Sequence, residues 1–211
     1  MRLTPNNTPK RPKRVRNHVN PLADQSVLEF AGFGNTRPIM IDIGAYRGEF
    51  AEQLVAHFSL THNFIVTEIR KPYAMYLREL FADQKEVEVF DGDSSKNITG
   101  LLKTSIESGA QVEYIFINFP DPWFKEKHKK RRVLNESFLD QIIQLGCTDT
   151  QIIFQTDQKP LFNETVEVIE EHGAYNISYF EKPLWDIQSY WETMKIGEGD
   201  AIYRMSIQLK K

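Results

Sequence analysis

The sequence PIMIDIGAYRG, residues 38–48, is the clearest structural signal in this chain of 211 residues. Its first six residues form an apolar run that is interrupted only by Asp42 and that ends at Gly44. Such a run is typical of a strand buried on both faces of a sheet. The apolar residues that follow, within 50–58, recur at helical spacing. The stretch therefore predicts a buried strand followed by a helix.

The same order of strand and helix repeats along the chain. Further strands are expected at 63–68, 87–90, 114–119 and 151–156, and helices at 73–80, 97–106, 138–145 and 161–169. Two more strand-like runs lie near 174–180 and 201–209, and no long helix is expected between them. Five strand–helix units and two late strands predict an α/β fold with a Rossmann-like, doubly wound sheet. Ligands bind such sheets beyond the carboxyl ends of the strands.

The composition excludes several classes of protein. Hydrophobic residues make up 41% of the chain, which is enough for a sizeable core and argues against a wholly disordered protein. No apolar run approaches the ~20 residues of a membrane span, and the N-terminus is basic and polar rather than a signal peptide. The single Cys147 excludes an intramolecular disulfide and a cysteine-cluster metal site. We therefore expect a cytoplasmic protein with no membrane association and no metal.

The net charge of -3 hides two strongly basic segments. Residues 1–20 hold six Lys or Arg and no acid, and residues 125–132, the basic run, hold six more against Glu126 alone. The rest of the chain is strongly acidic. This distribution favours contact with a polyanion such as nucleic acid, although a solvated tail and a solvated helix end would also explain it. Proline-rich residues 1–22 are expected to form a flexible basic arm, and residues 23–211 a single domain.

Every predicted strand end carries an acidic residue. The five are Asp42, Glu68, Asp93, Asp121 and Asp157. Because the carboxyl ends of parallel strands meet at one edge of the sheet, we expect these carboxylates to border one ligand site.

The first three strand ends have the features of a nucleotide-type site. Gly44 and Gly48 permit a tight turn and close approach of a ligand, although Tyr46 stands where a G-x-G-x-G loop has its middle glycine, and a plain strand-to-helix turn would also explain them. Glu68 is placed to bind ribose hydroxyls. Asp93 is placed either to accept a hydrogen bond from an adenine amino group or to cap the next helix.

The fourth strand end carries the densest signal, NFPDPWFKEKHKKRR at residues 118–132. Two prolines flank Asp121 and fix the backbone on either side of it. Trp123 and Phe124 offer flat faces for stacking a base, and the basic run behind them is suited to phosphates. Asp121 and Asp157 could together face the donor groups of guanine, although Asp157 could instead cap the following helix.

With these residues in place, the sequence resembles the tRNA (guanine-N7-)-methyltransferases of the class I S-adenosylmethionine type. FPDPWFKEKHKKRR at 119–132 is similar to the most diagnostic motif of that family. Weaker similarities cover nearly the whole chain in the right order: RNHVNPL at 16–22, DIG at 42–44, TEIR at 67–70, DGD at 91–93, TD at 156–157, YWE at 190–192 and GDAIYRM at 199–205.

The resemblance implies a class I methyltransferase fold and methyl transfer from S-adenosyl-L-methionine to N7 of a guanosine in the tRNA variable loop. It implies tRNA as the partner, and a monomer or homodimer with no obligatory protein partner. The implied cofactor-binding residues are Asp42, Gly44, Gly48, Glu68, Asp93 and Asp121, with Asp121 also the catalytic residue. The residues implied to bind substrate and tRNA are Lys125, Lys127, His128, Lys129, Lys130, Arg131, Arg132, Asp157, Ser189, Tyr190, Trp191 and Glu192.

The sequence departs from that family at four places. Asp42 stands where Glu is more frequent, Tyr46 replaces a glycine, and Ser189 stands where Thr is usual. Residues 193–196 lack the usual Arg-Gly pair. The Tyr46 departure motivates an alternative, a catalytically impaired RNA-binding module on the same fold. A nicotinamide-dependent oxidoreductase is a second alternative, but it would have no use for the motif at 119–132.

Overall fold

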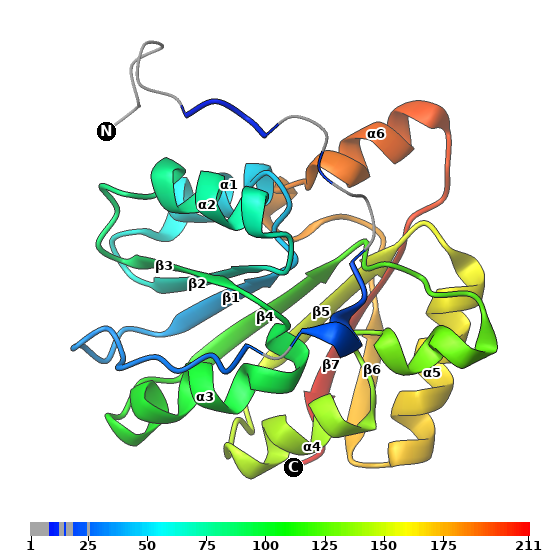
Figure 1. Cartoon of the computed structure of the whole chain (residues 1–211). Coiled ribbons are helices and arrows are strands. Elements are labelled where there is room, and N and C mark those ends of the chain that lie inside the picture. Colours follow the sequence, from blue (N-terminus) through cyan, green and yellow to red (C-terminus); the bar gives the residue numbers. More distant parts are fainter. Residues whose placement is uncertain (1–8, 13–14, 16–18, 25) are drawn as a thin grey trace.

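The structure, a computed structural model, describes residues 9–12, 15, 19–24 and 26–211. Within these residues seven strands form one sheet in the order β3-β2-β1-β4-β5-β7-β6 (Figure 1). The strands are β1 (Ile39–Ile43), β2 (Asn63–Glu68), β3 (Val87–Asp91), β4 (Val112–Asn118), β5 (Gln151–Thr156), β6 (Tyr175–Tyr179) and β7 (Tyr203–Leu209). The first five are parallel, whereas β7 runs antiparallel to both β5 and β6. This arrangement confirms the predicted doubly wound sheet, with its switch point between β1 and β4.

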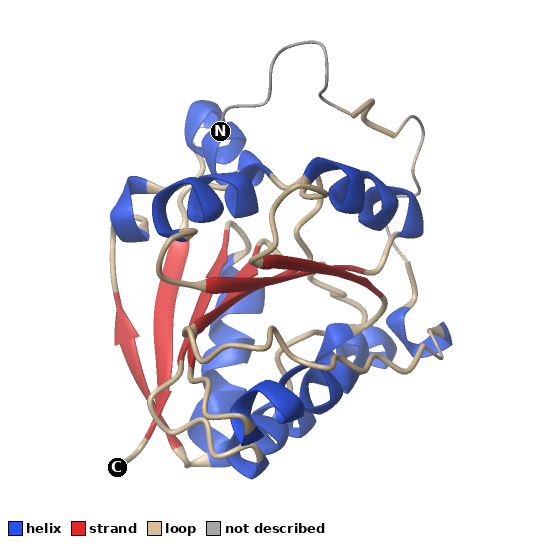
Figure 2. Ribbon diagram, turned by 90° about the vertical axis from the view of Figure 1, so that its left-hand side faces the viewer, coloured by secondary structure: helices blue, strands red, loops and turns tan. Residues whose placement is uncertain are grey.

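Helices cover both faces of the sheet (Figures 1 and 2). One face carries α1 (Glu49–Phe58), α2 (Lys71–Leu80) and α6 (Tyr190–Glu198), and the other carries α3 (Ser94–Glu107), α4 (Glu136–Gln144) and α5 (Lys159–His172). None of the described helices is long and apolar enough to cross a membrane.

The alternation of side chains along β1 divides the core into two halves. Ile39, Ile41 and Ile43 pack with the apolar residues of α3, α4 and α5. Met40 packs with those of α1 and α2. Because successive side chains of a strand point to opposite faces, Asp42 lies on the α1 face, like Met40. The same parity places Glu68 and Asn118, which end β2 and β4, on that face too. The strand ends therefore gather polar groups on the side where α1 and α6 lie.

The helix α6 is the main difference from the sequence prediction, which had no long helix between the two late strands. It has nine residues and buries only one of them, Glu192. Apolar periodicity therefore gave no indication of it. A capping box joins Ser189 and Glu192, each side chain bonding to the backbone of the other, and this motif is visible in the sequence as S-x-x-E.

Much of the predicted basic arm lies outside the described residues, namely 1–8, 13–14 and 16–18. Of the described part, Arg11 forms an ion pair of 3.2 Å with Glu49 at the start of α1. Residues 21–23 form a short 3₁₀ helix, η1 (Pro21–Ala23), whose N-cap is Asn20.

Candidate functional site

A pocket of about 760 Å³ lies beyond the carboxyl ends of β1 to β4. Four of the six predicted cofactor-binding residues line it: Gly44, Glu68, Asp93 and Asp121. Arg131 of the basic run also lines it, as do Trp123 and Asn118. These residues come from four separate parts of the chain, and the sheet brings them together at its strand ends.

Glu68 is buried at the end of β2 and accepts four hydrogen bonds. The guanidinium of Arg70 donates to both carboxylate oxygens, from Nε to Oε1 at 2.8 Å and from Nη2 to Oε2 at 2.7 Å. The backbone N–H groups of Arg70 and Tyr46 donate the other two, at 2.8 and 2.9 Å. A carboxylate has about four acceptor positions. Any further donor to Glu68 therefore has to replace one of these bonds, and the side chain of Arg70 is the group able to move.

A second, smaller pocket of about 300 Å³ adjoins the first, because Gly44 and Asn118 line both. It lies between the end of β1 and the first turn of α6, and Asp42 is part of its wall. Burial raises the pKa of Asp42 to about 7, and the charge of Glu68 adds to this increase. Oδ2 of Asp42 and both polar side-chain atoms of Asn118 are buried without a hydrogen-bond partner in the described chain. Unpaired buried polar atoms are costly, so these three indicate a place where a polar ligand binds.

Asp93 is the N-cap of α3, which is one of the two roles predicted for it. Its Oδ1 accepts hydrogen bonds from the backbone N–H of Ser95 at 3.1 Å and from the hydroxyl of Ser95 at 2.5 Å. Its Oδ2 lies 3.5 Å from Nζ of Lys96. The carboxylate still borders the larger pocket, so capping and contact with a ligand are compatible.

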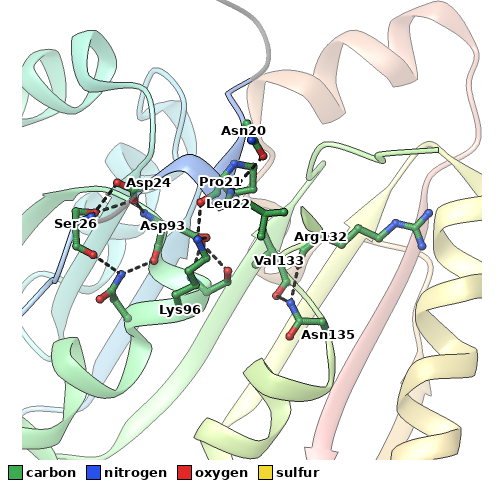
Figure 3. Close-up of polar contacts among 12 residues, drawn as sticks. Asn20, Pro21, Leu22, Asp24, Ser26, Asp93, Lys96, Arg132, Val133 and Asn135 are labelled. Atoms are coloured by element: carbon green, nitrogen blue, oxygen red, sulfur yellow. Dashed lines mark hydrogen bonds and ion pairs between the residues drawn. The ribbon is translucent and has the colours of Figure 1, made fainter. Parts of the chain in front are cut away.

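The chain segment before β1 packs against this helix start; we name the described residues 19–24 and 26–30 the strap. Oδ2 of Asp24 accepts a hydrogen bond from the backbone N–H of Asp93 and another from the hydroxyl of Ser26 (Figure 3). Nζ of Lys96 donates to the carbonyl of Pro21 at 2.6 Å. Burial alone would raise the pKa of Asp24, but hydrogen bonds from Ser26 and Asp93 outweigh it, and the net pKa is lowered. Asp24 is therefore a charged anchor for the strap.

Two glycines allow the strap to approach closely. A Cβ on Gly92 would lie 2.3 Å from Oγ of Ser26, and one on Gly100 would lie 2.1 Å from the carbonyl oxygen of Leu28. Real Cβ atoms do not come so close to another heavy atom. Val19 and Pro21 at the N-terminal end of the strap line the larger pocket. The strap is therefore a fixed wall of this pocket, which nothing in the sequence predicted.

Asp121 lies in a loop whose backbone is strained at both ends. Phe119 has φ 51° and Trp123 has φ 43°, values that bulky residues rarely adopt and that cost on the order of 1–3 kcal/mol each. The surrounding structure holds the loop: Nε of Arg132 donates to the carbonyl of Pro122 at 3.0 Å, and the guanidinium of Arg131 lies 4.9 Å from the ring centre of Trp123. Burial alone would lower the pKa of Arg70, but the hydrogen bond and the charge of Glu68 raise it, and the charge of Asp121 adds to this increase. Asp121 is thus held at the rim of the pocket near a cation.

The basic run forms a 3₁₀ helix, η2 (Glu126–Arg131), and its cations fall into two groups. Lys129 and Arg132 form ion pairs with Glu164 of α5, at 3.1 and 2.7 Å. Because Arg132 is also nearly buried, its first role is to anchor the loop. No ion pair joins Lys125, Lys127 or Lys130 to a described residue.

His128 in the same run adds little to this positive surface. Partial desolvation and the neighbouring charges of Arg131, Lys127 and Lys125 lower its pKa, so the imidazole is mainly neutral at neutral pH.

The remaining predicted residues lie around α6 and α1. Tyr190 and Trp191 border the smaller pocket, as does Ser189. Glu192 points inward instead: it is completely buried and forms an ion pair of 2.6 Å with Arg204 of β7. Gly48 allows close packing of the loop against α2, since a Cβ there would lie 2.6 Å from a methyl group of Leu77.

Asp157 lies at the end of β5 but does not cap α5, whose N-cap is Gln158. Its Oδ2 accepts a hydrogen bond of 2.6 Å from the side chain of Gln158 and lies 3.6 Å from Nζ of Lys195. Among the described residues, no group of three or more His, Cys, Asp or Glu side chains is placed to hold a metal ion.

Comparison with known proteins agrees with this arrangement. The family described as "Putative methyltransferase" matches residues 36–198. A tRNA (guanine-N(7)-)-methyltransferase of Lactobacillus acidophilus is 30% identical over 94% of this chain and 95% of its own length. The chain belongs to the tRNA (guanine-N7-)-methyltransferase family. A second member of this family, from Thermosynechococcus vestitus, is 27% identical over 92% of the chain and 94% of its own length.

Solved structures confirm the fold expected of a family member. A S-adenosylmethionine-dependent methyltransferase from Aquifex aeolicus superposes with a TM-score of 0.54 at 11% identity, covering 84% of this chain and 86% of its own. Precorrin-6y C5,15-methyltransferase from Geobacter metallireducens gives a TM-score of 0.51 at 12% identity, covering 84% of this chain and 83% of its own. This tRNA (guanine-N7-)-methyltransferase family member therefore has the class I methyltransferase fold.

Proposed function

We propose that the chain transfers a methyl group from S-adenosyl-L-methionine to N7 of a guanosine in the tRNA variable loop, giving 7-methylguanosine. The observation that carries the proposal is the loop at 119–124, which holds Asp121 on the rim of the strand-end pocket with the basic run directly behind it. One loop thus joins the strand-end pocket to a polycation. Family membership supports the same reaction. We propose that the enzyme acts in the cytoplasm, as a monomer or homodimer, without an obligatory protein partner.

The residues at the strand ends fit S-adenosylmethionine. Gly44 has φ 77°, and no atom lies within 4 Å of the position that a Cβ would take there, so a ligand can approach its backbone. The unpaired Oδ2 of Asp42 suits the ammonium of the methionine part. Glu68 suits the ribose hydroxyls once the side chain of Arg70 gives way, and Asp93, which borders the same pocket, would bind the adenine. Bound here, the cofactor supplies a methyl group attached to a positively charged sulfur.

Guanine N7 carries its lone pair in the plane of the ring, so no proton has to leave before attack. The protein therefore has to align N7 with the methyl group and to tolerate positive charge on the purine. We assign these tasks to Asp121, which positions the base and stabilises the cationic purine. Asp157 lies on the same edge of the sheet, beyond β5, and contacts the target nucleotide.

We expect the stability of the protein to fall between about pH 4 and pH 7 because of Asp42. Its folded-state pKa of about 7 exceeds the ~3.9 of an unfolded aspartate, so the folded protein binds more protons in this range. The free energy of unfolding contributed by Asp42 then falls as pH rises, by at most about 1.4 kcal/mol per pH unit. Urea denaturation at several pH values measures this slope. Asp42→Asn should remove it and Asp83→Asn, at an exposed position, should not; equal slopes in all three proteins would contradict the assignment.

We expect Asp24→Ala to weaken S-adenosylmethionine binding through the strap. The substitution removes an acceptor of the backbone N–H of Asp93, and hydrogen bonds to charged groups contribute about 1.5–3 kcal/mol. If the loss of this hydrogen bond loosens the pocket wall, the dissociation constant for S-adenosylmethionine rises by roughly 10-fold or more. Isothermal calorimetry measures it. Glu29→Gln, at an exposed position of the strap, is the control, and an unchanged affinity of Asp24→Ala would show that the strap is not part of the site.

We expect the basic run to bind tRNA phosphates mainly through its unpaired lysines. Lys127→Ala combined with Lys130→Ala should weaken tRNA binding and reduce the slope of log affinity against log salt concentration by about 1–2, because each lost phosphate contact removes about 0.9 from it. Filter binding at several salt concentrations measures the slope. Lys103→Ala with Lys85→Ala, which removes the same charge elsewhere, is the control. An unchanged slope would mean that the basic run is only solvated surface.

The function is tested directly by incubating the pure protein with unmodified tRNA and S-adenosylmethionine and searching the digested tRNA for 7-methylguanosine by mass spectrometry. Its formation supports the proposal. A protein that binds tRNA but not millimolar S-adenosylmethionine would instead be the impaired RNA-binding module. Binding of a nicotinamide cofactor would favour the oxidoreductase.

A further inference from the structure

Three aromatic side chains meet at the junction of the two pockets, and we name Tyr46, Tyr190 and Trp191 the aromatic surface. The ring centre of Tyr46 lies 5.8 Å from those of both Tyr190 and Trp191, and the latter two are 5.6 Å apart. Tyr46 belongs to the loop after β1, whereas the other two form the first turn of α6. All three line the smaller pocket together with Gly44 and Asn118, which also line the larger one. The aromatic surface therefore borders the site proposed for the methyl donor.

The backbone conformation of Tyr46 is strained. Its φ is 54°, in the left-handed region that favours glycine, and a strained residue of this kind costs on the order of 1–3 kcal/mol. Its backbone N–H bonds to Glu68, and its ring packs at 4.8 Å against Tyr73. Burial, followed by a hydrogen bond with Tyr73, raises the pKa of Tyr46 to about 12, so the phenol is neutral at neutral pH. Strain at such sites is typically retained for function.

The aromatic surface attracts cations. The guanidinium carbon of Arg47 lies 4.8 Å from the ring centre of Tyr46 and 5.3 Å from that of Tyr190. The guanidinium carbon of Arg70 lies 5.2 Å from the ring centre of Tyr46. These distances are within the range of cation–π attraction. Nε of Arg47 is buried without a hydrogen-bond partner in the described chain, so the ring faces are its main described contact. Two rings thus hold one flat, positively charged group.

A methylated guanine is also flat and positively charged. When the N7 lone pair bonds to the methyl carbon, the carbon–sulfur bond breaks and its electron pair stays on sulfur. The sulfur becomes neutral, the purine takes up the positive charge, and no proton is lost. The faces of aromatic rings therefore attract the purine more strongly as the reaction proceeds.

Building on the proposed function, we infer that the aromatic surface of Tyr46, Tyr190 and Trp191 binds the target guanine and selectively stabilises it as it becomes cationic. Arg47 occupies this surface in the structure and moves aside for the base, because two positive groups repel each other there. The unpaired amide of Asn118 lies beside the base in the same pocket, where it supplies both a donor and an acceptor. Tyr46 in place of glycine is then a device for binding substrate rather than a defect of the cofactor loop.

The other aromatic platform, Trp123 and Phe124, was the one expected from the sequence. Trp123 borders the larger pocket, with His128 at 5.7 Å and Arg131 at 4.9 Å from its ring centre, while Phe124 is 57% exposed. Because Trp123 already contacts His128 and Arg131 and Phe124 is mostly exposed, the aromatic surface, whose three rings line one pocket together, is favoured for the base. The tryptophans of the two platforms, Trp191 and Trp123, allow an experiment to separate them.

The first test compares variants in single-turnover methyl transfer to tRNA at saturating S-adenosylmethionine. Tyr46→Leu and Tyr190→Leu each remove a ring face, and we expect the rate to fall roughly 3- to 30-fold, as cation–π energies of about 0.5–2 kcal/mol imply. Tyr46→Phe and Tyr190→Phe, which keep the face, should recover most of this loss. Calorimetry with S-adenosylmethionine checks that each variant is folded. Leu variants as fast as the wild type would overturn the inference.

The second test follows tryptophan fluorescence while 7-methylguanosine or guanosine is added to the protein with S-adenosylhomocysteine. We expect stronger quenching by 7-methylguanosine than by guanosine, lost in Trp191→Phe and kept in Trp123→Phe. Quenching that instead disappears in Trp123→Phe would place the base on the other platform and overturn the inference. If the wild-type protein forms no 7-methylguanosine in tRNA, the proposed function fails. If the wild type is active and the Leu variants transfer methyl groups equally fast, only the inference about the aromatic surface fails.

Discussion

Replacing Asp121 with asparagine is expected to lower the rate of methyl transfer by at least about 100-fold, as the loss of a preorganised electrostatic group does in other enzymes. The carboxylate is held at the rim of the pocket by a loop fixed by two prolines and strained at Phe119 and Trp123. The backbone that carries the carboxylate is therefore fixed at this place. An asparagine of the same shape keeps the packing but removes the negative charge that we propose stabilises the cationic purine.

Single-turnover methyl transfer and calorimetry separate this effect from cofactor binding. We expect the affinity of Asp121→Asn for S-adenosylmethionine to change far less than the rate, since we propose that Asp42 and Glu68 bind the cofactor from other strands. Glu126→Gln is the matched control: it removes a carboxylate from the same segment, but one that is 85% exposed, so its rate should stay close to that of the wild type. A nearly unchanged rate in Asp121→Asn would exclude the charge role.

The sequence predicted best those parts of the fold in which the hydrophobic pattern directly reflects which side chains are buried. All residues of β1 and β2 are buried, including Asp42 and Glu68, so each strand reads as a mainly apolar run with an acid at or next to its last residue. The acids at strand ends could be placed in one site because parallel strands end at the same edge. Asp93 shows the limit of this rule. Asp93 makes the hydrogen bonds of a helix N-cap and also borders the pocket. The sequence alone could not show that one residue can both cap the helix and face a ligand.

The features that the sequence did not show depend on contacts between distant segments. The strap is held by Asp24 against Asp93 and by Asn97 against the backbone of Leu28 and Ser26, and nothing local marks these pairs. The run at 125–132 gave no indication that Arg132 and Lys129 are paired with Glu164. The resemblance to the family implied that both contact RNA, and this role remains a prediction.

Glu192 is the clearest such case, because the same resemblance implied a place in the substrate pocket. Its side chain is inaccessible to solvent, its Oε1 pairs with Arg204, and its Oε2 accepts from the side chain of Gln155 at 3.1 Å. Glu192 therefore joins α6 to β5 and β7. Since α6 buries no apolar side chain of its own, this charged connection is what positions Tyr190 and Trp191 beside the smaller pocket.

We expect Glu192→Ala to lower the free energy of unfolding by about 3–5 kcal/mol, because it leaves the charge of Arg204 buried without its partner. Urea denaturation measures the loss. Arg204→Ala should cost a similar amount. The double variant Glu192→Met, Arg204→Met should lose much less than the sum of the two, since replacing both charges by apolar groups leaves neither one unpaired.

A direct role of Glu192 in binding substrate would give a different pattern. Glu192→Gln keeps the size of the side chain and some of its hydrogen bonds but removes the charge. If Glu192 is structural, this variant loses stability, and its methyl-transfer rate per folded molecule stays close to that of the wild type at a temperature where it remains folded. Full stability with a large loss of rate would instead place Glu192 in the substrate site. Because the carboxylate is completely buried by β5, β7 and its own helix turn, we expect the loss to be in stability.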